Sequence, residues 1–117
     1  MSLSQTDCLR YIAEEAAFIT AQTTGASRLD LQQDIVLQRA LVRSFEIISK
    51  VTQQLDNSFR QRHPQMDWKT LTAIKEKLAQ AYFNVDEHFV FNICQHIPKL
   101  LTDVERIMNI EENVNKQ

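Results

Sequence analysis

Apolar residues recur along this chain at intervals of three and four positions, which is the spacing of one face of an α-helix. The first run predicts a helix over residues 4–22. Its apolar face consists of Leu9, Ile12, Ala16 and Ile19. Gly25 follows in a short polar stretch and can adopt the left-handed conformation that often ends a helix.

A second, longer run predicts a helix over residues 30–56, with Asp30 as its N-cap and Gln33 three residues later, as in a capping box. One apolar stripe consists of Leu37, Leu41, Ile48, Val51 and Leu55, and a second of Ile35, Val42 and Phe45. A helix with two apolar faces is buried on more than one side. We therefore expect this helix to be central, with one face against a second copy of the protein.

Residues 57–67 lack this periodicity and predict a connector, in which Phe59 is an apolar anchor and Pro64 keeps His63 extended. Asp67 is a suitable N-cap for a third helix that begins at Trp68. Its apolar face consists of Leu71, Ile74, Leu78 and Ala81, and the polar residues Asn84 and Asp86 end it.

A fourth helix is predicted to begin near Glu87, after Asp86 as its cap. Pro98 lacks an N–H and clashes with the preceding helical turn, which predicts a kink or a restart near 96–98. The last residues, 110–117, are predicted to form a frayed tail.

The composition changes this picture little. One Gly and two Pro in 117 residues are too few for the turns of a sheet, and 44% apolar residues are typical of a globular protein. The pattern therefore predicts an all-α single domain over residues 1–117, folded as an antiparallel up-and-down bundle of four to five helices with its last helix kinked near Pro98.

Charge and cysteine content restrict the partners. The net charge of −2 gives no overall basic field for nucleic acid, although Arg39, Arg43, Lys50, Arg60 and Arg62 cluster in sequence. These cations form either a solvated helix face or a local binding surface. The two cysteines, Cys8 and Cys94, lack the spacing of a disulfide framework or a zinc site. No signal peptide or membrane-spanning run is present, so we expect a cytoplasmic protein without a membrane partner.

Residue spacing alone indicates no phosphate-binding or metal-binding motif in this sequence. A single Gly excludes a Gly-rich phosphate loop, and no metal-binding His or Glu pair with helical spacing occurs. His88 and His96 are poorly aligned on one helical face. We therefore expect no metal and no cofactor.

Several segments nevertheless resemble a known family in order and spacing. They are Leu-Gln-Arg-Ala at 37–40, Phe-Glu-Ile-Ile at 45–48, Phe-Arg-Gln-Arg-His-Pro at 59–64, Asp-Trp at 67–68, Ala-Tyr-Phe-Asn-Val-Asp at 81–86 and Ile-Pro-Lys-Leu-Leu at 97–101. Over about residues 37–108 the chain resembles the HEPN superfamily, and within it the HepT-like branch. The resemblance implies a dimerising helical bundle that acts as a metal-independent RNA endonuclease toxin beside a minimal nucleotidyltransferase antitoxin. In that branch an Arg contacts phosphate, a His five residues later moves a proton, and a Tyr two residues further on can receive AMP.

On this sequence the Arg position is Lys75, the His position is Gln80 and the Tyr position is Tyr82; Glu76 and Asn84 would line the site. Lys75 keeps the charge of Arg without its planar fork. Gln80 cannot titrate near neutral pH and so cannot act as a general acid or base. Glu76 adds negative charge where RNA phosphate would lie. The family's Gly-Glu pair on the second helix is likewise replaced, by Ser49-Lys50.

Helix geometry adds one condition. Residues five apart point roughly 140° apart on an ideal helix, so Lys75 and Gln80 converge only if the helix ends near Gln80 or a symmetric dimer brings two copies together. Any site would then be a cleft at the dimer interface, lined by both copies of the third helix, and we expect the dimer to form through the second and third helices.

Three hypotheses follow. The first is a degenerate HepT-like protein whose cleavage is lost or weakened. The second is an active ribonuclease in which another group, such as His63 from the connector, replaces the missing histidine. The third is a non-enzymatic module that serves a nucleotidyltransferase as a substrate-binding subunit or accepts AMP at Tyr82.

Overall fold

The computed structural model of the chain describes residues 3–80 and 87–115, and every regular element within these ranges is an α-helix. The helices are α1 (Gln5–Thr23), α2 (Arg28–Gln33), α3 (Ile35–Thr52), α4 (Asn57–Arg62), α5 (Trp68–Gln80) and α6 (Glu87–Asn115). The predicted all-α class is confirmed. Among the described residues, none of these helices is both long and apolar enough to cross a membrane.

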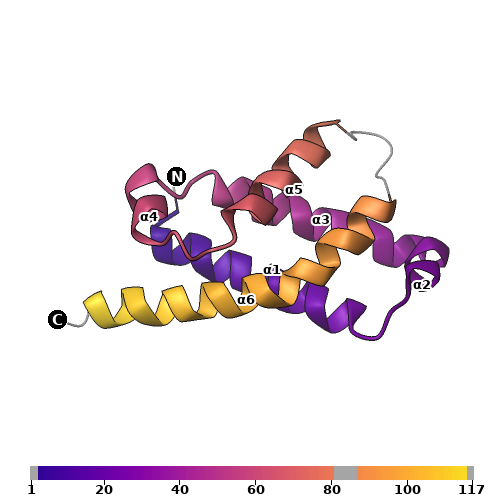
Figure 1. Cartoon of the computed structure of the whole chain (residues 1–117), viewed down its shortest axis with the longest axis horizontal. Helices are drawn as coiled ribbons and strands as arrows, with labels where there is room; N and C mark the ends of the chain where they lie inside the picture. The colour runs from indigo at the N-terminus through magenta and orange to yellow at the C-terminus, as the bar shows by residue number, and fades with distance from the viewer. Residues whose placement is uncertain (1–2, 81–86, 116–117) are drawn as a thin grey trace.

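Three long helices build the body of the molecule, which measures 50 × 28 × 24 Å. Figure 1 shows α1 running in the opposite direction to both α3 and α6, and α1 packs against both of them. The shorter α5 packs on α3 and, less extensively, on α6. The arrangement is a bundle of antiparallel neighbours, with the short helices α2 and α4 at its two ends (Figure 1).

The first helix follows the predicted pattern closely. Ser4 caps α1, and its side chain and that of Asp7 form a reciprocal capping box. The predicted apolar face is fully buried, with Leu9, Ile12, Ala16 and Ile19 at 0% exposure. Gly25 has a φ of 79°, the left-handed conformation predicted for the end of this helix.

The second predicted helix is in fact two helices. Asp30 is not an N-cap: Ser27 caps α2, and Asp30 lies three residues later as its capping-box partner. A second cap follows at Asp34, whose Oδ1 accepts the backbone N–H of Leu37 at 3.0 Å and starts α3. Ser27 and Asp34 each cap a helix start, so two helices replace the single helix that the continuous apolar pattern predicts.

The connector contains a short helix of its own. Asp56 caps α4 by accepting the backbone N–H of Phe59 at 2.7 Å, and Phe59 is fully buried. The predicted start of the next helix is confirmed, since α5 begins at Trp68 and Asp67 accepts the backbone N–H of Thr70 at 3.1 Å. The local capping residues therefore determine both boundaries.

The two predicted stripes of the second helix do not become two buried faces. Leu41, Ile48 and Phe45 are all fully buried in one core, so the predicted separation of Phe45 onto another side is wrong. Ile35 belongs to the second stripe and is 62% exposed. The core face of α3 is wide because α1 and α5 both pack against it.

The last helix is continuous from Glu87 to Asn115 and contains Pro98. Its axis changes direction in Figure 1 between its orange first part and its yellow end, so a kink rather than a restart accommodates the proline. The helix also continues through Asn115, where fraying was predicted from residue 110. Glu111 contributes to this order through its contacts with α4, described below.

Candidate functional site

The expected site begins on α5, whose packing residues form the predicted scaffold. Leu71 and Ile74 are buried, Leu78 is partly buried against the core, and Thr70 is buried at the first turn. The Thr70 hydroxyl donates to Asp67 Oδ2 at 2.7 Å, which fixes the start of the helix. The orientation of α5 is thus set by its N-terminal cap and by one apolar face.

Lys75 and Glu76 occupy the opposite, exposed face of α5. Neither side chain forms a hydrogen bond or an ion pair with another residue in the described part of the chain. They are therefore available to a ligand or to a second protein copy. The negative charge of Glu76 offsets part of the positive charge of Lys75 at the neighbouring position, which weakens the attraction of this pair for phosphate.

The described part of α5 extends to Gln80, and the approach of Lys75 to Gln80 stays a prediction. The side chain of Gln80, and all of Tyr82 and Asn84, lie outside the described residues. Lys77 lies on the side of α5 that faces α6, with its Nζ 5.8 Å from the centroid of the Phe89 ring. This cation–π contact joins the last described turn of α5 to the first turn of α6.

The cationic cluster noted in the sequence divides into two groups. Arg60 donates to the Thr52 carbonyl at 3.0 Å and lies over the Trp68 ring, so its role is to join α3, α4 and α5. Arg62 is bound to Glu111 at 3.2 Å. Arg39, Arg43 and Lys50 instead lie exposed along α3, where Arg43 pairs with Glu46 at 3.3 Å. Arg62 is exposed but already paired with Glu111, so the second group is the one less engaged with the fold.

His63 is a structural residue in this fold. It ends α4, its side chain is 5% exposed, and its Nε2 lies 2.6 Å from Glu111 Oε1. Its ring packs 4.7 Å from that of Phe59. Its carbonyl accepts the indole N–H of Trp68 at 2.9 Å, so His63 lies beside the first residue of α5. Gln80 is 12 residues further along this helix, which corresponds to a distance of roughly 18 Å along the helix axis.

The contact between His63 and Glu111 could not be predicted from the sequence, because 48 positions separate the two residues. It joins the end of α4 to the penultimate turn of α6, and Arg62 completes the group. The His63 hydrogen bond, reinforced by Arg62, lowers the pKa of Glu111 below its usual 4.5, against the opposing effect of burial.

This lowered pKa makes a pH-dependent prediction. A carboxylate whose pKa falls on folding adds stability above its unfolded pKa and loses it as the pH falls through the folded value. The substitution Glu111→Gln should therefore destabilise the protein above pH 4.5, and the gap to the natural chain should narrow as the pH falls below 4.5. Urea unfolding at a series of pH values measures this gap.

The exposed Glu105 on the same helix supplies the control, since Glu105→Gln should change stability little at any pH. A gap for Glu111→Gln that stays constant down to the lowest pH at which the protein folds would contradict the assignment.

No group of three or more His, Cys, Asp or Glu side chains within residues 3–80 and 87–115 is arranged to hold a metal ion. Both cysteines are buried, and burial raises the pKa of the Cys94 thiol to about 11. A thiolate nucleophile at Cys94 is therefore disfavoured near neutral pH.

Comparison with known proteins identifies the family. The Ribonuclease HepT-like family matches residues 12–107. A "Putative RNase" from Caldanaerobacter subterraneus subsp. tengcongensis is 34% identical over 105 residues, covering 89% of this chain and 94% of its own. A "Probable ribonuclease HepT" from Thermococcus cleftensis is 31% identical over 108 residues, covering 92% of this chain and 98% of its own. No solved structure matches at a comparable level of significance. The matched range spans α1 to most of α6, and the chain belongs to the HepT-like ribonuclease family of the HEPN superfamily.

Proposed function

We propose that this chain is a HepT-like protein in which metal-independent RNA cleavage is lost or severely weakened, while the fold and the surfaces for its partners are kept. The observation that carries the proposal is Gln80, a non-titrating residue at the position where the family's proton-transferring histidine is expected. The buried face of α5 retains its packing residues, so the change affects chemistry rather than the scaffold.

The charges beside Gln80 support the same conclusion. Lys75 offers a point charge where a planar guanidinium would bind phosphate with two hydrogen bonds. Glu76 is exposed next to it and repels an approaching phosphate. His63, the substitute base considered above, is buried against Glu111 at the far end of α5. Within one chain it lies too far from Gln80 to replace the missing imidazole.

The direct test is an RNA cleavage assay with the purified natural chain in the presence of EDTA, using structured and single-stranded RNA. We expect no cleavage above the buffer control. Robust cleavage that disappears in the Gln80→Ala variant would contradict the proposal, because Gln80 would then be needed for the reaction. Cleavage that persists in the Gln80→Ala variant would instead favour an active ribonuclease that uses another group.

An active ribonuclease remains the second candidate function, since both relatives above carry ribonuclease names. It requires a general acid or base that titrates near neutral pH. His88 and His96 are exposed on α6. Cleavage with a pH profile that is abolished by His88→Ala or His96→Ala would establish this candidate.

A homodimer through α3 and α5 is part of the proposal. Three large apolar side chains at the α2–α3 corner support it: Leu29 is 57% exposed, Ile35 62% and Val36 75%. Covering such side chains is favourable by about 1.5–3 kcal/mol for each one fully buried. Sedimentation should show a dimer, and the double variant Ile35→Asp and Val36→Asp should shift it to monomer. A natural chain that stays monomeric at high concentration would exclude the dimer.

The proposed partner is a minimal nucleotidyltransferase, as in a toxin–antitoxin pair, with Tyr82 as the acceptor of AMP. Tyr82 keeps the phenol that such a transfer needs, although the neighbouring positions have changed. Incubation with the partner and ATP should add one AMP to the chain by mass spectrometry, and Tyr82→Phe should prevent it. Tyr11, an exposed tyrosine on α1, is the matched control: Tyr11→Phe should still be modified. An unmodified natural chain would reject the acceptor role.

We also place the protein in the cytoplasm. The two thiols are buried and unpaired, as expected for a reducing compartment. Fractionation of cells that express the tagged protein tests this, and recovery outside the cytoplasmic fraction would contradict it.

A further inference from the structure

A shallow groove lies on the surface between α1 and α3, and its volume is about 340 Å³. Its apolar lining consists of Leu3, Tyr11, Ile47 and Val51. Tyr11 is 39% exposed, and Phe18, seven residues further along α1, is 40% exposed. Because seven residues make about two turns of a helix, both rings lie on the same side of α1. The bundle therefore leaves apolar surface uncovered along this side of α1 and beside α3.

The other long helices lie away from this groove. The helices α5 and α6 pack against each other, α5 also packs against α3, and α6 also packs against α1. They thus cover one side of the α1–α3 pair, and the groove lies on the other side. Ile35, which supports the proposed dimer, is 16 positions from Val51 and points about 160° away from it around α3. The groove and the proposed dimer contact therefore lie on different flanks of α3.

The two walls of the groove carry opposite charges. Glu14 and Glu15 lie on the α1 wall, and Lys50 lies on the α3 wall. Glu14 and Lys50 are both exposed. Within the described part of the chain, none of these three side chains forms an ion pair. An acidic edge and a basic edge therefore flank the apolar surface, and both are available to a partner.

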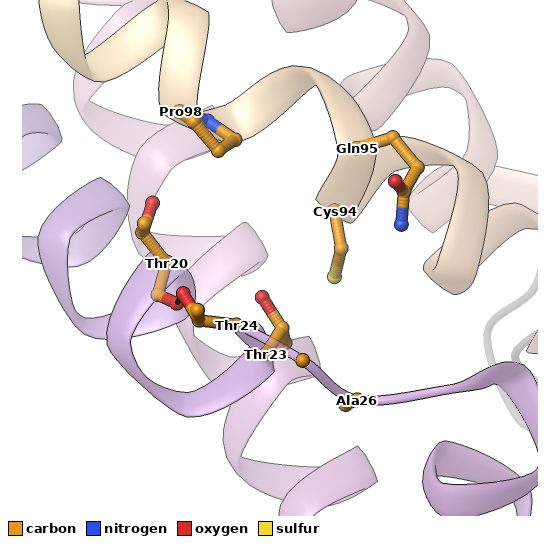
Figure 2. Close-up of a pocket in the computed structure, with 8 residues that line it drawn as sticks. Thr20, Thr23, Thr24, Ala26, Cys94, Gln95 and Pro98 are labelled. Carbon is orange, nitrogen blue, oxygen red and sulfur yellow. Dashed lines mark hydrogen bonds between the residues drawn. The ribbon is translucent and has the colours of Figure 1, made fainter.

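A second pocket of the fold lacks this arrangement. It lies between the end of α1 and the middle of α6 and has a volume of about 190 Å³. Figure 2 shows Thr20 and Thr24 of α1 across from Cys94 and Pro98 of α6. Of the described residues that line this pocket, none has an acidic or basic side chain. It offers no charge by which a partner could be selected, whereas the α1–α3 groove offers both signs.

Opposite charges on two antiparallel walls make the groove complementary to a copy of itself. A two-fold axis parallel to α1 and α3 places α1 of one copy over α3 of the other. Such an axis keeps every residue at its own height along the helices, and Glu14 and Lys50 share one height because they line the same groove. Each Glu14 then faces Lys50 of the partner subunit. A two-fold axis across the helices would instead place α1 over α1 and bring like charges together.

We propose that the α1–α3 groove is a contact surface for a second copy of this chain, in which two α1–α3 pairs pack face to face with α1 of each copy over α3 of the other. The contact covers the exposed rings of Tyr11 and Phe18. It is separate from the proposed dimer through α3 and α5, and it joins two such dimers. Exposed ion pairs are weak and are screened by salt, so this contact forms at high protein concentration and low ionic strength.

Charge reversal tests this pairing by sedimentation equilibrium at high protein concentration and low salt. Glu14→Lys and Lys50→Glu should each weaken the association of the natural chain about tenfold, because each places like charges at two symmetric positions. An equimolar mixture of the two variants should associate again, since every lysine of one variant then faces a glutamate of the other. The chain that carries both substitutions should also associate, because its two walls have exchanged sign.

Glu105→Lys and Arg106→Glu, at exposed positions of α6, change the net charge by the same amounts and are the matched controls. Both should associate as the natural chain does. The proposal is overturned if the mass of the natural chain does not rise with concentration beyond the proposed dimer, or beyond the monomer where that dimer is absent. It is also overturned if mixing Glu14→Lys with Lys50→Glu gives no gain in mass, or if the controls weaken association equally. The gain on mixing does not depend on the α3–α5 contact or on RNA, so this test and those of the proposed function can fail independently.

Discussion

Replacing Gln80 with histidine and Lys75 with arginine together is expected to raise metal-independent RNA cleavage by about 10²–10⁴-fold, the usual contribution of a general acid or base. The histidine restores a group that titrates near neutral pH, and the arginine restores a planar fork for phosphate. The scaffold of α5 is intact beneath both positions, because Ile74 and Leu71 fill its buried side. Initial rates on a fluorogenic RNA, measured across pH 5–9, test the expectation.

The control places the histidine one residue earlier. Ala79 is exposed on the same turn, and a side chain there points about 100° away from position 80. The variant Ala79→His with Lys75→Arg should therefore stay at background. Adding Glu76→Gln to the active variant should raise the rate further by removing a charge that repels phosphate. Equal rates for the variants at positions 79 and 80 would show that histidine at the expected position does not restore catalysis.

The second large effect is on stability. Phe59→Ala should lower the free energy of unfolding by about 3–5 kcal/mol, a large share of the 5–15 kcal/mol typical of a domain. Phe59 is fully buried, packs 4.7 Å from the His63 ring, and meets the Trp68 ring edge-on at 6.4 Å. It anchors the six-residue helix α4, which is too short to be stable alone. Urea unfolding measures the change.

Val114→Ala near the end of α6 is the matched control. Val114 is 60% exposed, so its truncation should change the free energy of unfolding by no more than about 0.5 kcal/mol. If Phe59→Ala lowers the free energy of unfolding by as little as the control does, α4 contributes little to the stability of the fold. Because Phe59 also supports His63, the variant should weaken the link between α4 and Glu111 as well.

Local signals in the sequence account for much of this fold. The boundary at Trp68 and the left-handed Gly25 follow from a capping side chain and from the conformational freedom of glycine. The buried face of α1 follows from apolar spacing. The prediction of one helix over 30–56 was wrong because a continuous apolar pattern does not reveal which of several nearby caps, Ser27 or Asp34, begins a helix.

The candidate site was predictable only in part. The positions of Lys75 and Glu76 on an exposed face follow from helical spacing. The burial of His63 does not, because the carboxylate that binds it lies 48 positions away. A small pocket between the end of α1 and the middle of α6 is similarly non-local, since residues of both helices line it. No spacing rule within either helix indicates that Thr20 and Cys94 line the same space.

The sequence alone determined that this protein is helical and where three of its helices begin, and by resemblance it predicts a glutamine at the position of a catalytic histidine. These are local properties, set by periodicity, capping and side-chain chemistry. The tertiary structure decided that His63 supports the fold rather than a reaction, and that the hydroxyl of Thr20 is left without a partner among the described residues beside α6. Both outcomes depend on which helices pack against each other. Contacts between residues far apart in the sequence arise from that packing, and local sequence patterns do not encode them.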